Sequence, residues 1–380
     1  MMSRTSYARM GIVCVSTTGW LCTAAFAQTT RPVPTIDEQR RMFDNVPRNL
    51  FGTSVIWAEW LNKDWSYDTM QYELIRQLGC THANANIPWY WVEEVPGKWY
   101  FEYVDHAVDE ATRRGLAVYA YMGHTPKWAF PPEAAGKRWD EGYRYPPPDD
   151  RTDAFVEYCR QVARRYRGKV KYYQFWNEPN GCSWVRDGCG NTDGYPLYTK
   201  WLKIWYTAMK SEDPDCVLAA GALDYHENVK DGYTYLEGMY REGAKDYFDA
   251  FSIHPYDSKG TISHRAIEDT RRVMVEHGDA HKGIWISEFG WNTKDEDTKS
   301  ERLVKTIREL HDPRYFYVTM AHYLCLRDPD RGGDYGLVND DLTPRKSYHA
   351  FKQIITDLRW QEASRPVGRG SSSRPVGPRD

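Results

Sequence analysis

Residues 172–180 read Tyr-Tyr-Gln-Phe-Trp-Asn-Glu-Pro-Asn, a short strand-like run that leads directly to Glu178. Residues 283–290 read Gly-Ile-Trp-Ile-Ser-Glu-Phe-Gly and place Glu288 in the same way. Other strand-like runs alternate with helical segments from Leu50 to Leu358, which favours parallel βα units over a sandwich. The carboxyl ends of parallel strands meet at one rim of a barrel. We therefore predict an α/β fold, a single (β/α)8 TIM barrel that brings the two glutamates together.

The expected helices follow from the spacing of apolar residues. Between Asp153 and Arg167 the apolar residues recur every three to four positions, which indicates a helix with one face against a barrel. Glycines follow the helices expected at Tyr67–Leu78 and Val104–Arg114, as is common at helix ends. The eight expected strands are Leu50–Ile56, Thr81–Ile87, Ala117–Tyr121, Val170–Trp176, Val217–Gly221, Phe248–Tyr256, Gly283–Ser287 and Tyr317–Leu326.

Two facing carboxyl groups at a barrel rim are suited to hydrolysis of a glycosidic bond. When the anomeric configuration is retained, one group protonates the leaving oxygen and the other attacks the anomeric carbon, at a separation of about 5–5.5 Å. We assign Glu178 as the general acid and base, which must be protonated before the first step, and Glu288 as the ionised nucleophile. The alternative is that both are structural carboxylates at strand ends.

Asn177-Glu178-Pro179 resembles the acid/base signature of the clan A glycoside hydrolases, and Ser287-Glu288-Phe289-Gly290 resembles their nucleophile strand. The resemblance runs from Leu50 to Leu358, looks closest to family 39, and implies a retaining glycosidase that needs no cofactor. Within that family the chain looks closer to bacterial exopolysaccharide-processing members than to the β-xylosidase or α-iduronidase branches. The other similar stretches are Trp89–Glu94, Gly97–Phe101 with Asp105, Gly115–Val118, Thr125–Ala129, Arg165–Val170, Ser252–Tyr256, Gly336-Leu337 and Thr343-Pro344.

The resemblance also implies roles for residues beside the catalytic pair. Asn177 should hydrogen-bond the 2-hydroxyl of the sugar, although a buried asparagine can instead satisfy backbone groups. His254 and Tyr256 lie two residues apart and so share one face of their strand. Tyr256 should donate to Glu288 with His254 nearby, unless either residue simply packs inside the barrel.

Four more residues are expected near the substrate. Trp89 and Trp128 follow the second and third strands and are candidate stacking platforms, with plain packing as the alternative. Asn84 stands where family 39 often has arginine, and His322 opens the stretch where it often has tryptophan. Both positions line the subsite of the scissile sugar in that family, so these differences leave the identity of the sugar open.

The N-terminus and the cysteines indicate an exported protein. Arg4 and Arg9 precede a short apolar run that ends in an Ala-x-Ala site at Ala27, typical of a cleaved secretory signal. We therefore expect a secreted or periplasmic protein with no membrane span. Cys182 and Cys189 enclose a short loop after Glu178 and are expected to form a disulfide. The other mature cysteines are expected to be small buried hydrophobes: Cys80, Cys159, Cys216 and Cys325.

The domain plan has four parts. We expect a signal peptide over 1–27, a polar lead-in over 28–49, the barrel over 50–360 and a tail over 361–380. The tail is too rich in Ser, Arg, Pro and Gly to bury a core. The net charge of −3 and the lack of a basic run argue against a nucleic-acid partner. No metal site is expected, because Gly278 and Asp279 break the helix that His277 and His281 would need.

We expect a monomer that cleaves a polysaccharide or oligosaccharide. Cleavage within the chain is favoured because the accessory domain that often closes the pocket of an exo-enzyme has no room here. The 16 Trp and 28 Tyr residues fit an aromatic sugar cleft as well as an aromatic core. Three alternatives stay open: an exo-acting β-glycosidase such as a β-xylosidase, a transglycosylase that uses the same site, and a catalytically silent carbohydrate-binding barrel.

Overall fold

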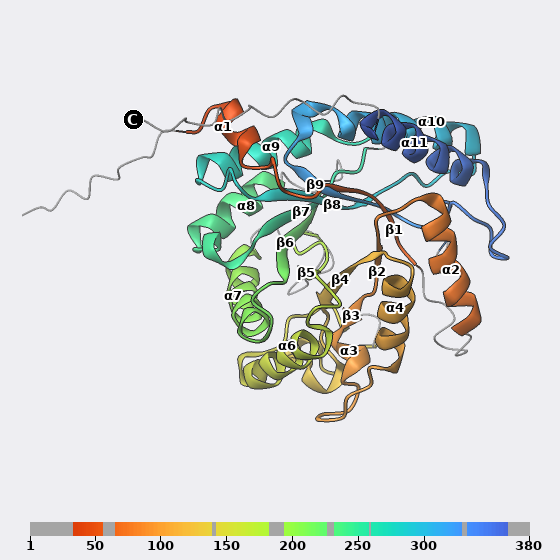
Figure 1. Cartoon of the computed structure of the whole chain (residues 1–380). Helices are drawn as coiled ribbons and strands as arrows, with labels where there is room; N and C mark the ends of the chain where they lie inside the picture. The colour runs from red at the N-terminus through yellow and green to blue at the C-terminus, as the bar shows by residue number, and fades with distance from the viewer. Residues whose placement is uncertain are drawn as a thin grey trace, which may run out of the picture. The chain divides into compact units, whose positions relative to one another are not determined.

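The computed structural model describes residues 33–55, 65–138, 142–181, 194–225, 232–257, 260–328 and 333–363. Its strands form one parallel sheet in the order β2-β1-β9-β8-β7-β6-β5-β4-β3, and β2 also pairs with β4, which closes the barrel (Figure 1). The strands are β1 Asn49–Thr53, β2 His82–Asn84, β3 Ile87–Pro88, β4 Ala117–Gly123, β5 Tyr172–Phe175, β6 Val217–Asp224, β7 Ala250–His254, β8 Gly283–Phe289 and β9 Val318–Tyr323.

The helices lie outside the strands, and several consecutive helices pack against one another around the barrel. Helix α6 buries an apolar face that includes Phe155, Cys159 and Val162, as its spacing predicts. The helices are α1 Ile36–Arg41, α2 Trp65–Leu78, α3 Trp89–Val92, α4 Glu102–Arg113, α6 Thr152–Tyr166, α7 Tyr195–Glu212, α8 Gly232–Arg241, α9 His264–Glu276, α10 Glu296–His311 and α11 Lys346–Ala363. The predicted (β/α)8 barrel is confirmed.

Several strand limits differ from those expected, for reasons of pairing. The expected second strand is split into β2 and β3, and both parts pair with β4, so together they fill one position of the barrel. Strand β8 runs on to Phe289, because Phe289 pairs with Tyr323 of β9. Glu288 therefore lies within a strand rather than after one. Strand β6 runs on to Asp224 past an irregularity near Ala222, a residue with φ of 56°.

The interior of the barrel contains histidine imidazoles as well as apolar side chains. His82 is fully buried and fills the space beside Gly52, where a Cβ atom would lie 2.1 Å from the imidazole. Glycine at this position is therefore a packing requirement of β1. Cys80, Cys159, Cys216 and Cys325 are free and buried, as expected. No helix in the described ranges is both long and apolar enough to cross a membrane.

Some sequence predictions fall outside the described residues. These are the signal peptide over 1–27, the Cys182–Cys189 disulfide and the tail beyond Ala363. The expected lead-in contains α1, whose first turn is held by Thr35 and Glu38 in a reciprocal capping box.

Candidate active site

The loop after β5 holds Glu178 in a backbone conformation that is uncommon for side-chain-bearing residues. Trp176 and Glu178 have φ values of 62° and 45°. The loop is tied to β6 by a hydrogen bond from the Glu178 amide to the Ala222 carbonyl (3.1 Å). The buried Asn180 side chain adds two bonds, to the amide (2.9 Å) and carbonyl (2.8 Å) of Asp224. Strained backbone of this kind persists where neighbouring structure enforces it, and here the bonds to β6 do so.

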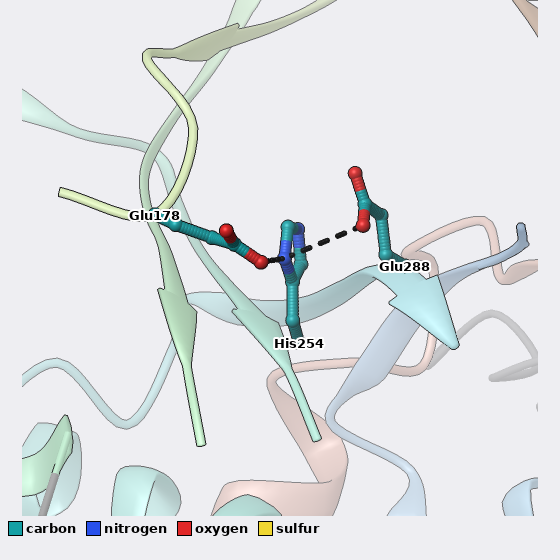
Figure 2. A group of neighbouring side chains, drawn as sticks. All are labelled: Glu178, His254 and Glu288. Carbon is teal, nitrogen blue, oxygen red and sulfur yellow. Dashed lines mark hydrogen bonds and ion pairs between the residues drawn. The ribbon is translucent and has the colours of Figure 1, made fainter. Parts of the chain in front are cut away.

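Glu288 points from β8 towards Glu178, with His254 of β7 between them (Figure 2). His254 Nδ1 lies 3.0 Å from Oε1 of Glu178 and 3.6 Å from Oε2 of Glu288. One oxygen of each carboxylate and this nitrogen all lie within 4.8 Å of one another. The Tyr256 hydroxyl donates to Oε2 of Glu288 at 3.0 Å. The carboxylates are 24% and 27% exposed, whereas the His254 side chain is fully buried, so substrate can reach the acids from one side.

The three groups influence each other's protonation. Burial by itself lowers the pKa of His254, but the charge of Glu288, the hydrogen bond to Glu178 and the charge of Glu178 outweigh it and raise the pKa to about 9. Burial raises the pKa of Glu288; the positive charge of His254 lowers it, and the charge of Glu178 raises it again. Two carboxylates this close repel each other, and a cation between them relieves the repulsion.

Beneath His254, a row of hydrogen-bonded polar side chains lies in the interior of the barrel. Nε2 of His254 lies 3.0 Å from the Ser287 hydroxyl, which lies 2.6 Å from the Ser252 hydroxyl. Ser252 donates to Oε1 of Gln174 at 2.8 Å, and the Tyr119 hydroxyl donates to the same oxygen at 2.8 Å. Gln174, Ser252 and Ser287 were not predicted as site residues from the sequence. The available signal was alternation, because Ser252 lies two residues before His254 and so shares its face of β7.

A family model for "Cellulase (glycosyl hydrolase family 5)" matches residues 37–322, most of the chain. The chain belongs to glycosyl hydrolase family 5. The expected clan A membership is confirmed, and the family match makes the protein a glycosidase. No curated protein matches this family 5 hydrolase in sequence.

Solved structures similar to the hydrolase include family 39 enzymes, the family that its motifs resemble. A family 39 glycoside hydrolase from Bacteroides cellulosilyticus WH2 has a TM-score of 0.67 and 20% identity, over 86% of this chain and 66% of that one. A family 39 β-xylosidase from Caulobacter crescentus has a TM-score of 0.61 and 16% identity, over 82% of this chain and 72% of that one. The exo-β-1,4-mannosidase Op5Man5 from Opitutaceae bacterium strain TAV5 has a TM-score of 0.60 and 13% identity, over 83% of this chain and 60% of that one. At these identities the likeness establishes the fold alone.

The two rim tryptophans of the hydrolase differ in exposure. Trp89 is 1% exposed; its indole N–H donates to Oε2 of Glu93 (2.7 Å) and its ring stacks on Tyr158. A buried ring has no free face for a sugar, so the expectation that Trp89 is a stacking platform is corrected to one of packing. Trp128 is half-buried, donates to the Glu93 carbonyl (2.8 Å) and meets Trp89 edge-on, so it stays a candidate sugar contact.

Asn84 and His322 also lie deeper than expected. The Asn84 side chain is 3% exposed and accepts from the Val55 amide at 2.7 Å. His322 is 1% exposed, bonds to the Ser54 hydroxyl at 2.9 Å and packs against His82, and its burial holds its pKa well below the ordinary value. Both residues hold the end of β1, and in this structure neither reaches the surface that a sugar would touch. Asn177, beside the acid, is half-buried and stays a candidate.

Glu178, His254 and Glu288 are also the one group of possible metal ligands within the described ranges. A metal would have to take the place of the proton that the two carboxylates favour on His254, because a ligating histidine must give up the proton at its ligating nitrogen. Carboxylates with an imidazole between them can act on protons without an ion. We therefore interpret the cluster as acid–base machinery.

A second feature at this rim is an aromatic cavity of about 550 Å³. It is separated from the acid loop by a layer of rings, since Tyr90 stacks near His124 and His124 meets Trp176 edge-on. The cavity is lined by Trp65, Tyr90, Trp91, Tyr100 and Tyr103, with Glu94, Glu102 and Lys127 among its polar residues. None of these aromatic residues was predicted individually as a site residue from the sequence.

Proposed function

We propose that this hydrolase cleaves O-glycosidic bonds of a polysaccharide with retention of anomeric configuration, with Glu178 as acid and base and Glu288 as nucleophile. The observation that carries the proposal is the approach of the two carboxylates, with one oxygen of each within 4.8 Å. This approach is close to the separation of about 5–5.5 Å in retaining enzymes, whereas inverting enzymes need about 6.5–9.5 Å to admit a water molecule.

In the proposed first step, a carboxylate oxygen of Glu288 attacks the anomeric carbon while the bond to the leaving oxygen breaks. The leaving oxygen takes the proton of Glu178. Oε2 of Glu288 already accepts a hydrogen bond from Tyr256, which favours Oε1 as the attacking atom. In the second step, Glu178 removes a proton from water, and the water oxygen displaces Glu288 from the sugar. A sugar hydroxyl in place of water would give transglycosylation through the same intermediate.

The first-formed product anomer tests retention. We expect proton NMR, recorded during the first minutes of hydrolysis, to show the anomer of the substrate before mutarotation. The physical reason is that two displacements at one carbon restore the starting configuration. An initial product of opposite configuration would establish inversion and refute the double displacement. Mass spectrometry of the same samples separates hydrolysis products from transglycosylation products.

We also propose cleavage within the polysaccharide chain. The aromatic cavity at the same rim, beyond the ring layer of Tyr90, His124 and Trp176, supports this, because aromatic faces and carboxylates together suit additional sugar units. The competing exo mode, removal of sugars from a chain end, is supported by two structural neighbours that are described as a β-xylosidase and an exo-β-1,4-mannosidase. Early products of mixed length indicate the endo mode, and release of one sugar at a time indicates the exo mode.

Tyr100 tests the contribution of the cavity. We expect Tyr100→Ala to raise KM about three- to tenfold on long oligosaccharides, because one aromatic contact is worth about 0.5–1.5 kcal/mol. Activity on an aryl monoglycoside should not change. Val95→Ala is the matched control: both residues are about 40% exposed on the loop before α4, but Val95 does not line the cavity. Equal KM values for Tyr100→Ala and the parent enzyme on every chain length would exclude the cavity as a sugar site.

Export is part of the proposal and rests on the signal-like residues 1–27. We expect the mass of the exported protein to correspond to a chain that starts at Gln28. Alkylation without reduction should leave Cys182 and Cys189 unmodified if they form the proposed disulfide. A retained N-terminus, or two alkylated thiols at these positions, would contradict the corresponding part of the proposal.

A further inference from the structure

His254 touches both catalytic carboxylates through one ring nitrogen and the barrel interior through the other. We infer that the buried row Gln174, Ser252 and Ser287 fixes the hydrogen of the neutral His254 ring on Nε2, so that Nδ1 is the atom that exchanges a proton with Glu178. This inference rests on the proposed function and deepens it. It makes the three residues positioning residues, which act through His254 and do not touch the substrate.

The amide orientation of Gln174 is set by its neighbours. Its Nε2 donates to the Trp176 carbonyl at 3.0 Å, which leaves Oε1 facing the hydroxyls of Tyr119 and Ser252. An amide oxygen can only accept. Each of these two hydroxyls must therefore use its single hydrogen on Gln174.

The same reasoning, in which each hydroxyl has one hydrogen to donate, applies to Ser252 and Ser287. Because the Ser252 hydrogen is engaged by Gln174, the 2.6 Å contact between Ser252 and Ser287 needs the hydrogen of Ser287. Because the Ser287 hydrogen is then engaged, the 3.0 Å contact between Ser287 and His254 needs a hydrogen on Nε2. If Ser252 instead donated its hydrogen to Ser287, Oγ of Ser252 and Oε1 of Gln174 would face each other at 2.8 Å with no hydrogen between them. Folded proteins avoid such unpaired buried oxygens.

A hydrogen fixed on Nε2 leaves Nδ1 as the titrating atom of His254. In one state Glu178 holds the proton and donates it to Nδ1 over 3.0 Å; in the other the proton is on Nδ1 and both glutamates are ionised. The two states contain the same number of protons, so the transfer needs no solvent. The charged or titratable groups that act on the ring are Glu178 after β5, Asp224 of β6, Tyr256 after β7 and Glu288 of β8. All the carboxylates among them favour the proton-bearing ring.

The tautomer can be observed directly in the whole, active enzyme. We expect two-bond proton–nitrogen NMR of the histidine-labelled protein to show His254 with a hydrogen on Nε2 at a pH where the ring is neutral. The His254 signals among the 11 histidines are assigned by their loss in His254→Ala. A neutral ring with its hydrogen on Nδ1 would overturn the inference. Because this measurement needs no turnover, it stands even if Glu288→Ala stays active and the proposed function fails.

Ser287→Ala supplies the functional test. Without its acceptor, the ring should place its hydrogen on Nδ1, donate to the Glu178 carboxylate and make that group ionise more readily. We expect kcat/KM for poor leaving groups to fall about tenfold or more, the basic limb of the pH profile to move to lower pH, and acidic aryl glycosides to be nearly unaffected. Ser287→Thr, which keeps the hydroxyl, should restore much of the loss.

Ser300→Ala is the matched control, since Ser300 is a buried serine whose hydroxyl bonds to the Glu296 carbonyl in α10. It should leave the pH profile in place. If Ser287→Ala fails to fold, Ser252→Ala breaks the same row one step further away, and the limb should shift in the same direction. A folded Ser287→Ala or Ser252→Ala enzyme that is equally slow on all leaving groups, with an unmoved pH limb, would refute the positioning role.

Discussion

Glu288→Ala abolishes turnover, with an expected loss of about 10⁴- to 10⁶-fold in kcat, the range seen when one member of a catalytic unit is removed. In the proposed mechanism Glu288 forms the covalent bond to the sugar, and neither of its closest polar neighbours can replace it. His254 is fully buried, and Tyr256 is a phenol whose pKa is raised well above its ordinary value, chiefly by burial. The measurement is steady-state hydrolysis of an activated aryl glycoside of the correct sugar.

Azide provides the positive control for this variant. A small anion can enter the space left by the Glu288 side chain and attack the anomeric carbon from the same side. Activity should then return, and the glycosyl azide product should have the inverted configuration. Appreciable activity of Glu288→Ala without azide would show that the nucleophile has been assigned incorrectly. Retention of configuration in the azide product would contradict the proposed direction of attack.

Glu178→Ala separates substrates by their leaving group. For a glycoside with a sugar or alkyl leaving group we expect a loss of about 10²–10⁴-fold, the usual contribution of general acid–base catalysis. A glycoside of an acidic phenol needs no proton to leave, so its first step should be nearly normal. The observable signature is a burst of phenol followed by slow turnover, because the second step has lost its general base.

The matched comparison for Glu178→Ala is Glu94→Ala. Glu94 is an exposed glutamate at the aromatic cavity, so its loss should not distinguish between good and poor leaving groups. If Glu178→Ala slowed good and poor leaving groups equally, Glu178 would not be the proton donor.

The barrel could be predicted because its signals are local. The apolar spacing between Asp153 and Arg167 predicts a helix with one buried face, and α6 has that face. Glu178 and Glu288 could be paired from their positions in the sequence, because parallel strands in a barrel end at the same rim. The split of the second strand was not predictable in the same way, because β2 and β3 are defined only by their separate pairing with β4.

The neighbours of the pair were harder to predict, because burial is a property of packing between segments. Trp89 reads as a rim aromatic in the sequence, yet Glu93 and Tyr158 enclose it. Asn84 and His322 occupy positions that often line the sugar subsite in family 39, yet they bond to Val55 and Ser54 below the surface. The side chains that enclose them come from other strands and helices, and their positions are set by the registers of the closed barrel.

By itself, therefore, the sequence determined the fold class and the two carboxylates, since both follow from strand-end position and apolar period. The tertiary structure alone decided that His254 lies between those carboxylates and that Ser287, Ser252 and Gln174 lie beneath it. These four side chains come from three different strands, and only the register between β5, β6, β7 and β8 brings them within hydrogen-bonding distance. Single-strand alternation states which face a residue occupies, but it does not state which residue of the next strand lies beside it.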